Sequence, residues 1–186
     1  INVCTYQSVS GGGKAAIDEL AHQTAALLSA KEVKTEAFSR QIAFNVIPQI
    51  DVFMDNDYTK EEMKMVWETK KIMGDDSILV NATAVRVPVF YGHGEAIHLE
   101  TRSPIDAEDV KELLANAPGI VLHRDREDFP TQVSSASGND NTHVGRVRND
   151  ISHPNGINLW VVSDNVRKGA ATNSVQIAEV LIRDYM

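Results

Sequence analysis

Two charged side chains stand where their surroundings suggest a ligand. Arg86 lies in the middle of the valine-rich run 84–89, and His93 follows seven residues later between two glycines. A guanidinium offers parallel N–H donors that match a carboxylate, and an imidazole exchanges protons near neutral pH. Each residue also has a plainer interpretation, as an arginine on a solvated sheet face and an exposed histidine in a turn. The pair therefore suggests anion binding and proton transfer without establishing either.

Three further features have chemistry that suits an anionic substrate. Glu61 and Lys64 are three residues apart, so on a helix they share one face, where an ordinary surface ion pair is the alternative. Gln7 carries an amide that can orient a polar group. The run Ser10–Lys14 places three glycines before a predicted helix, where backbone N–H groups can meet an anion. A flexible connection explains these glycines equally well, and the spacing is not that of a P-loop.

The sequence shows neither a convincing nucleophile nor a metal site. Cys4 is the single cysteine, in the strand-like run 1–7, and no neighbouring residue in the sequence would lower the pKa of its thiol. We therefore expect a small strand residue there. The six histidines show no metal-ligand spacing, and there is no paired-cysteine motif or EF-hand loop. We expect no metal site.

Composition narrows the class of protein. The 186 residues are 42% hydrophobic and 24% charged, which predicts a globular chain that is either one domain or one large piece of a larger protein. A formal net charge of −8 argues against a nucleic-acid or anionic-membrane surface. There is no apolar run long enough to span a membrane and no signal-peptide pattern, so we expect neither a membrane protein nor a secreted one. A lone cysteine fits the reducing cytoplasm.

Both helices and strands are predicted to position these residues. Hydrophobic periodicity predicts helices over 14–30, 106–115 and 170–183, and Thr59 with Glu62 forms a capping-box pattern that opens another helix, ending near Gly74. Strand-like runs cover 78–90, 95–101, 119–122, 144–147 and 157–162, and we expect the first two to pair as antiparallel neighbours. The apolar segment 43–54 is predicted to cross the core as a buried irregular stretch. The fold class is α+β, with a mixed, mostly antiparallel sheet and helices packed on one face.

Five segments, taken together and in order, closely resemble the C-terminal part of aspartate-β-semialdehyde dehydrogenase. They are Thr5–Gly11, Phe44–Asp51, Thr59–Lys64, Ala84–Val89 with His93, and Asn158–Ala171. The resemblance implies a domain like the C-terminal half of glyceraldehyde-3-phosphate dehydrogenase. Residues 1–165 would form the dimerisation and substrate domain, and residues 166–186 a helix that packs on a nucleotide-binding domain absent from this chain. The sister family, N-acetyl-glutamyl-phosphate reductase, is a weaker match.

The resemblance also implies a reaction and residue roles. The family reduces β-aspartyl phosphate to aspartate semialdehyde with NADPH and releases phosphate, on the route to lysine, methionine and threonine. By similarity, His93 would be the general acid–base and Gln7 would orient the acyl intermediate. Arg86 would bind the substrate carboxylate, Glu61 its amino group and Lys64 the phosphate.

The cofactor contacts and the departures from the family follow from the same resemblance. Ser10, Gly11 and Asn165 would approach the nicotinamide end of NADP, which is bound mainly by the missing first domain. The family's nucleophilic cysteine belongs to an Asn-Cys motif upstream of this chain, Cys4 stands where relatives have Ser or Thr, and Gly94 stands where many have Ser. We therefore expect a fragment that is inactive alone, with a homodimer, the small-molecule substrate and phosphate as partners. A non-catalytic assembly module of the same fold, or a domain like that of the sister reductase, is the alternative.

Overall fold

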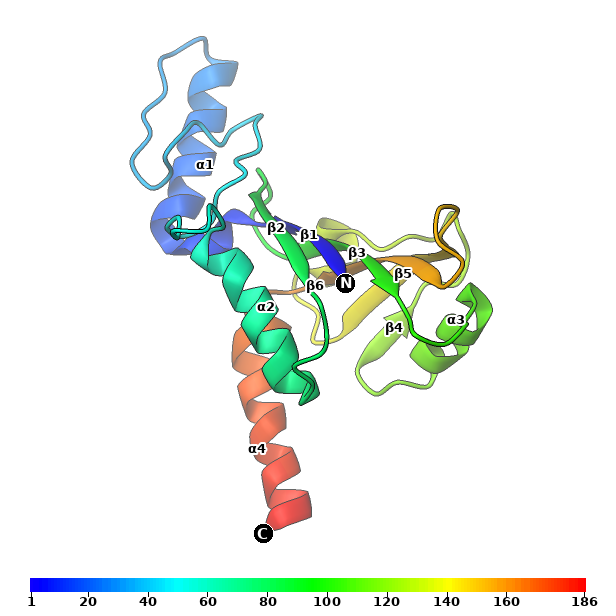
Figure 1. Ribbon diagram of the computed structural model, residues 1–186. Helices are drawn as coiled ribbons and strands as arrows, with labels where there is room; N and C mark the ends of the chain where they lie inside the picture. Colours follow the sequence, from blue (N-terminus) through cyan, green and yellow to red (C-terminus); the bar gives the residue numbers. More distant parts are fainter.

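The computed structural model describes all 186 residues, and a six-stranded mixed sheet forms its centre (Figure 1). Across the sheet the strands run in the order β2-β1-β3-β6-β5-β4. β1–β2 and β4–β5 are parallel pairs, and the other three pairs are antiparallel. This confirms the predicted α+β class. The strands are β1 (Asn2–Gln7), β2 (Asn81–Arg86), β3 (His93–Glu100), β4 (Ile120–Leu122), β5 (Thr142–Asn149) and β6 (Gly156–Ser163).

Four α-helices accompany the sheet, close to where periodicity predicts them. α2 packs against β2, and α3 packs against β4 and β5, whereas α1 and α4 extend away from the sheet (Figure 1). None of the helices is both long and apolar enough to cross a membrane. The helices are α1 (Gly13–Leu28), α2 (Lys60–Met73), α3 (Ala107–Ala115) and α4 (Thr172–Tyr185), with short helical turns η1 (Val9–Gly12), η2 (Gln132–Ala136) and η3 (Arg167–Ala171).

Eleven of the buried apolar residues form two clusters. The first joins α1 to the irregular segment that follows it, and the second joins α3 to β5 and β6. Each fully buried Val, Leu or Ile contributes about 1.5–3 kcal/mol relative to an exposed one. The clusters are Val9, Ala16, Leu20, Ile42, Ala43 and Ile47 in the first, and Ala107, Val144, Val147, Ile157 and Leu159 in the second.

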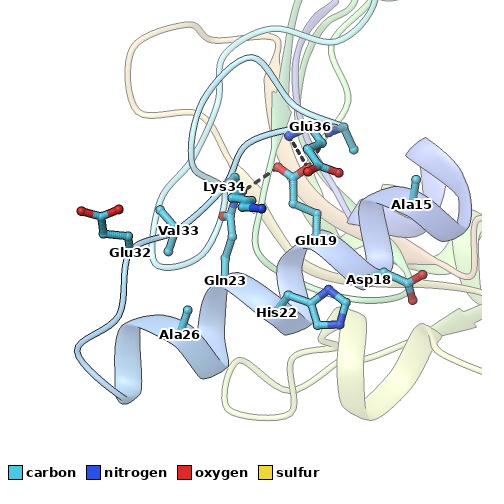
Figure 2. Close-up of a pocket in the computed structure, with 11 residues that line it drawn as sticks. Ala15, Asp18, Glu19, His22, Gln23, Ala26, Glu32, Val33, Lys34 and Glu36 are labelled. Carbon is cyan, nitrogen blue, oxygen red and sulfur yellow. Dashed lines mark hydrogen bonds between the residues drawn. The ribbon is translucent and has the colours of Figure 1, made fainter.

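Two buried polar side chains of α1 hold the long connection between α1 and α2. Glu19 Oε2 accepts the N–H of Glu36 at 2.8 Å, and Gln23 Nε2 donates to the carbonyl of Lys34 at 2.8 Å (Figure 2). Gln23 Oε1 accepts the N–H of Ile42 at 2.9 Å. These bonds replace the backbone partners that an irregular segment lacks. Glu19 and Gln23 also line a cavity of about 600 Å³, so its buried polar groups already serve the fold.

The predicted antiparallel pairing of runs 78–90 and 95–101 is wrong. β1 lies between β2 and β3, parallel to the former and antiparallel to the latter. After Arg86 the chain stays beside the segment that follows β1, with Val9 N donating to Val89 O at 2.8 Å. Residues 87–92 are therefore a crossing over the end of β1, and no tight turn joins the two strands.

The segment 43–54 is irregular, as predicted, but only part of it is buried. Ile47 and Ile50 face the interior, while Phe44, Val52 and Phe53 are each more than 60% exposed. Ile47 also makes an isolated antiparallel bridge with Arg86, so that the segment fixes the end of β2 from its outer side. Its apolar residues therefore divide between core and surface.

The N-terminus of α2 is tied to the sheet by one carboxylate. The capping box predicted from Thr59 and Glu62 is present, with Glu62 Oε2 accepting the N–H of Thr59 at 2.7 Å. The other oxygen, Oε1, accepts the N–H of Ala84 in β2 at 2.9 Å. All three residues are buried, so Glu62 sets the position of α2, and of Glu61 and Lys64, relative to β2.

We expect Glu62→Ala to lower the free energy of unfolding by about 2–4 kcal/mol, because it leaves two buried N–H groups without acceptors. Urea unfolding measures this. The matched control is Glu68→Ala on the exposed side of the same helix, expected to change stability by about 0.5 kcal/mol or less. Equal effects of the two substitutions would contradict the anchoring role of Glu62.

Candidate functional site

Four strand ends meet at one edge of the sheet, and the predicted site residues are placed there. Gln7 ends β1 and Arg86 ends β2, and the parallel register sets them directly opposite each other. β3 runs the other way, so it begins at this edge with His93, which pairs with Ser163 at the end of β6. Asn165 follows two residues later. Residues distant in sequence are thereby brought within reach of one another.

Gln7, Glu61 and Lys64 form one hydrogen-bonded group. Gln7 Nε2 donates to Glu61 Oε1 at 3.1 Å, and Lys64 Nζ donates to Glu61 Oε2 at 3.0 Å. Burial favours the neutral carboxyl of Glu61, but the bonds from Gln7 and Lys64 outweigh it and lower the pKa of Glu61. The bond to Glu61 in turn raises the pKa of Lys64. The group therefore presents a full negative and a full positive charge at neutral pH.

Arg86 is a buried cation with a neutral partner. Its side chain belongs to a residue only 7% exposed, and Nη1 donates to the main-chain oxygen of Ser8 at 2.7 Å. Burial lowers the pKa of Arg86, and the carboxylate of Glu61 opposes that shift. A guanidinium has five N–H donors, so most of its capacity is left for a ligand. A planar anion suits that arrangement because it can accept two parallel bonds.

His93 is held neutral next to this cation. Burial, and then the positive charge of Arg86, lower the pKa of His93 to about 4. Its Nδ1 accepts the N–H of Ser8 at 3.2 Å. At pH 7 the ring is therefore uncharged, and the same residue, Ser8, contacts both the imidazole and the guanidinium.

Glycine is required at two positions around these side chains. A Cβ on Gly11 would lie 2.8 Å from Arg86 Nη1 and 3.4 Å from His93 Nε2, so Gly11 keeps the backbone close to both groups. A Cβ on Gly94 would lie 2.7 Å from the ring of Trp160. Gly94 thus leaves room for the ring of Trp160, and a serine at this position would clash with it.

Asn165 braces the turn that carries His93. Its Oδ1 accepts the N–H of Gly92 at 3.0 Å, and its Nδ2 donates to Ser10 Oγ at 3.0 Å. Ser8 Oγ lies 3.0 Å from Ser10 Oγ and 3.2 Å from Asn165 Oδ1. The three residues suggested as cofactor contacts, Ser10, Gly11 and Asn165, therefore lie beside the imidazole and the guanidinium.

Sequence reasoning missed three polar residues that hold this edge together. Ser8 is fully buried and bonds to both His93 and Arg86. Gln132 Nε2 donates to the carbonyls of Tyr6 and Gly92 at 2.8 and 2.7 Å. Asp164 is also buried and accepts three backbone N–H groups, from Gly138, Val166 and Arg167. Ser8 and Asp164 directly follow a strand end, which was the available signal, whereas no signal in the sequence pointed to Gln132.

The structure supports the expectation that Cys4 is not a nucleophile of this site. Cys4 and Gln7 are three positions apart in β1, so their side chains point to opposite faces of the sheet. No group of three or more His, Cys, Asp or Glu side chains is arranged to hold a metal ion. The chemistry that the site does offer is a clamp for a carboxylate, a carboxylate–ammonium pair, and a neutral imidazole.

Comparison with known proteins agrees with this chemistry. Residues 1–168 match the family model described as "Semialdehyde dehydrogenase, dimerisation domain". Aspartate-semialdehyde dehydrogenase 2 of Vibrio cholerae is 71% identical over 185 residues, covering 100% of this chain and 55% of that protein. The Bacillus subtilis aspartate-semialdehyde dehydrogenase is 49% identical over 189 residues, covering 96% of this chain and 54% of that protein.

Solved structures give the same result. The Vibrio cholerae aspartate semialdehyde dehydrogenase II complexed with ASA superposes with a TM-score of 0.97 at 70% identity, covering 100% of this chain and 55% of that one. The Candida albicans aspartate semialdehyde dehydrogenase with NADP superposes with a TM-score of 0.68 at 26% identity, covering 97% of this chain and 49% of that one. The chain thus spans about half the length of the relatives it matches.

In an NMR titration of the chain, we expect the imidazole of His93 to titrate near pH 4, and Arg86→Gln to raise that midpoint because it removes a neighbouring positive charge. The pKa in the folded state lies below the ordinary value, so the unfolded state binds the proton first. His93 therefore contributes stability at neutral pH that is lost as the pH falls from about 6.5 towards 4.

Arg167→Gln is the control, because Arg167 is exposed and pairs with Asp140. It should leave the titration of His93 unchanged. A midpoint near 6.5 in the unaltered chain would show that His93 is neither buried nor close to the guanidinium.

Proposed function

This chain belongs to the semialdehyde dehydrogenase dimerisation-domain family, and from that membership we propose that it is the substrate-binding part of an aspartate-semialdehyde dehydrogenase. The whole enzyme would reduce β-aspartyl phosphate to aspartate semialdehyde with NADPH and release phosphate, a step towards lysine, methionine and threonine. The observation that carries the proposal is the placement of Arg86 and His93 together beside Gly11.

Each charged group of the substrate has a matching group here. Arg86 binds the α-carboxylate, because its guanidinium is buried and has free donors. Glu61 meets the α-ammonium, and Lys64 meets the phosphate as a point charge. In the structure these two bind each other at 3.0 Å, so substrate would replace an existing ion pair. Their charges persist at neutral pH because each stabilises the other.

The reacting carbonyl belongs beside the imidazole. Both His93 and Arg86 contact Ser8 where Gly11 allows close approach, and His93 is the acid–base group because an imidazole exchanges protons whereas a guanidinium stays charged. Gln7 orients the acyl group through its amide, which reaches Glu61 at 3.1 Å.

NADPH supplies the hydride when it is bound. The residues of this chain fit its nicotinamide end, because the missing Cβ of Gly11 leaves the backbone open and Ser10 and Asn165 carry polar atoms beside it. Most of the cofactor would be held by a nucleotide-binding domain outside this chain.

Two interfaces belong to the same proposal. The domain 1–165 forms a homodimer, in line with the family description. The segment 166–186 packs on the nucleotide-binding domain through the exposed apolar face of α4, where Ile177, Leu181 and Ile182 are each at least half exposed. The proposed location is the cytoplasm, where a lone cysteine stays reduced.

In the full-length dehydrogenase that the proposal implies, we expect Arg86→Lys to reduce kcat/KM for aspartate semialdehyde by about 10- to 100-fold, mainly through KM. Lysine keeps the charge but loses the bidentate geometry. Steady-state kinetics in both substrates measures this, and the KM for phosphate should change little.

Arg167→Lys, at an exposed arginine, is the matched control. Unchanged kinetics in Arg86→Lys would refute the carboxylate clamp. A preference of the unaltered enzyme for N-acetyl-glutamyl substrates would favour the sister reductase, and an enzyme with no activity would favour an assembly module.

The chain by itself is expected to show no phosphate-dependent NADP reduction. Covalent catalysis requires a nucleophile, and the thiol of Cys4 lies on the face of β1 opposite Gln7. A spectrophotometric assay of NADPH formation with aspartate semialdehyde and phosphate tests this. Turnover that survives Cys4→Ser would show that a nucleophile has been overlooked.

A further inference from the structure

We propose that Asn165 is a positioning residue for His93, which it holds, through Ser8, as the tautomer with its proton on Nε2. The inference deepens the proposed acid–base role of His93 and rests on it for its meaning in catalysis. The tautomer itself is a property of the chain that can be measured without substrate.

The first step concerns a hydrogen-bond donor that cannot act as an acceptor. A backbone N–H can only donate, and the N–H of Ser8 points at His93 Nδ1 from 3.2 Å. Nδ1 must therefore present its lone pair. A neutral imidazole with an unprotonated Nδ1 carries its proton on Nε2, the nitrogen that would lie 3.4 Å from a Cβ on Gly11.

The second step fixes the orientation of the Asn165 carboxamide. The backbone N–H of Gly92 donates to it at 3.0 Å, so the atom facing Gly92 is the oxygen. The nitrogen Nδ2 then faces Ser10 Oγ, also at 3.0 Å, and donates to it. Gly92 directly precedes His93 in the chain, so the same amide fixes the backbone from which the imidazole extends.

The third step carries this direction to the imidazole. Ser10 Oγ accepts from Nδ2, and its own proton has two acceptors within reach, Ser8 Oγ at 3.0 Å and Asn165 Oδ1 at 3.1 Å. Ser8 Oγ likewise lies 3.2 Å from both His93 Nδ1 and Asn165 Oδ1. Because the N–H of Ser8 already makes Nδ1 an acceptor, we assign the hydroxyl protons to the direction from Asn165 through Ser10 and Ser8 to Nδ1.

The competing arrangement places the proton on Nδ1, donated to Ser8 Oγ. It would set that N–H against the N–H of Ser8, two donors 3.2 Å apart at a partly buried site.

The tautomer with its proton on Nε2 determines whether His93 first donates or accepts a proton in its proposed role. A reacting carbonyl oxygen beside Gly11 would meet a neutral ring that donates a hydrogen bond through Nε2. Accepting a proton at Nε2 would require the ring to move its own proton first. Asn165 keeps a second N–H on Nδ2, which remains available for the nicotinamide carboxamide.

The test is Asn165→Asp, which is isosteric and keeps an oxygen for the N–H of Gly92 but replaces the donor Nδ2 with an acceptor. The hydroxyls of Ser10 and Ser8 should then turn towards the carboxylate, and the donor chain should reverse. By ¹⁵N NMR of the imidazole nitrogens, the unaltered chain is expected to show a pyridine-like Nδ1 and a pyrrole-like Nε2 for His93. In the variant, Nδ1 should gain pyrrole character, and the pKa of His93 should rise by about one unit or more.

The matched control is Asn158→Asp, because Asn158 lies in the adjoining strand β6 and its Oδ1 contacts another histidine, His98 Nδ1, at 3.3 Å. It should leave the tautomer and pKa of His93 unchanged. A resting ring protonated on Nδ1, or an Asn165→Asp variant with an unshifted ring, would overturn the proposal. These readouts need no turnover, so they stand even if the kinetics of Arg86→Lys refute the proposed function.

Discussion

Parallel pairing of β1 with β2 is the constraint on which the rest of the structure depends. It sets the ends of the two strands side by side, so Gln7 and Arg86 fall opposite each other. The antiparallel neighbour β3 must then begin at the same edge, with His93. α2 reaches this edge because the carboxylate of Glu62 bonds to the backbone of Ala84. The pairing of β1 with β2 therefore brings together side chains from four elements, namely β1, β2, β3 and α2.

The charged groups at this edge determine one another's ionisation. The guanidinium of Arg86 is buried against a neutral carbonyl, and its charge helps to keep His93 neutral. Glu61 and Lys64 stay ionised because they bind each other. The result is one full anion, two cations and a neutral imidazole at pH 7. That combination suits a small substrate with more than one anionic group, because two cations can be engaged while the imidazole meets an uncharged carbonyl.

Local features were predictable from the sequence because they depend on neighbouring residues. Thr59 and Glu62 predicted the capping box, and residue chemistry alone singled out Arg86 and His93. The place of β1 between β2 and β3 was not predictable from periodicity, because pairing partners are set by contacts distant in sequence. Ser8 and Gln132 were not predicted as site residues for a related reason. Neither belongs to a sequence motif with a recognisable spacing, and the role of each appears only when its hydrogen-bond partners are known. The mixed burial of 43–54 likewise depends on α1, which covers one side of the segment.

The most direct test of the account is a crystal structure of the protein with aspartate semialdehyde and phosphate bound. The account predicts the substrate carboxylate within hydrogen-bond distance of the Arg86 guanidinium, and the aldehyde oxygen within hydrogen-bond distance of His93 Nε2, at the edge where β1 and β2 end. Substrate bound elsewhere, such as in the cavity between α1 and residues 32–37, with Arg86 and His93 uncontacted, would contradict it.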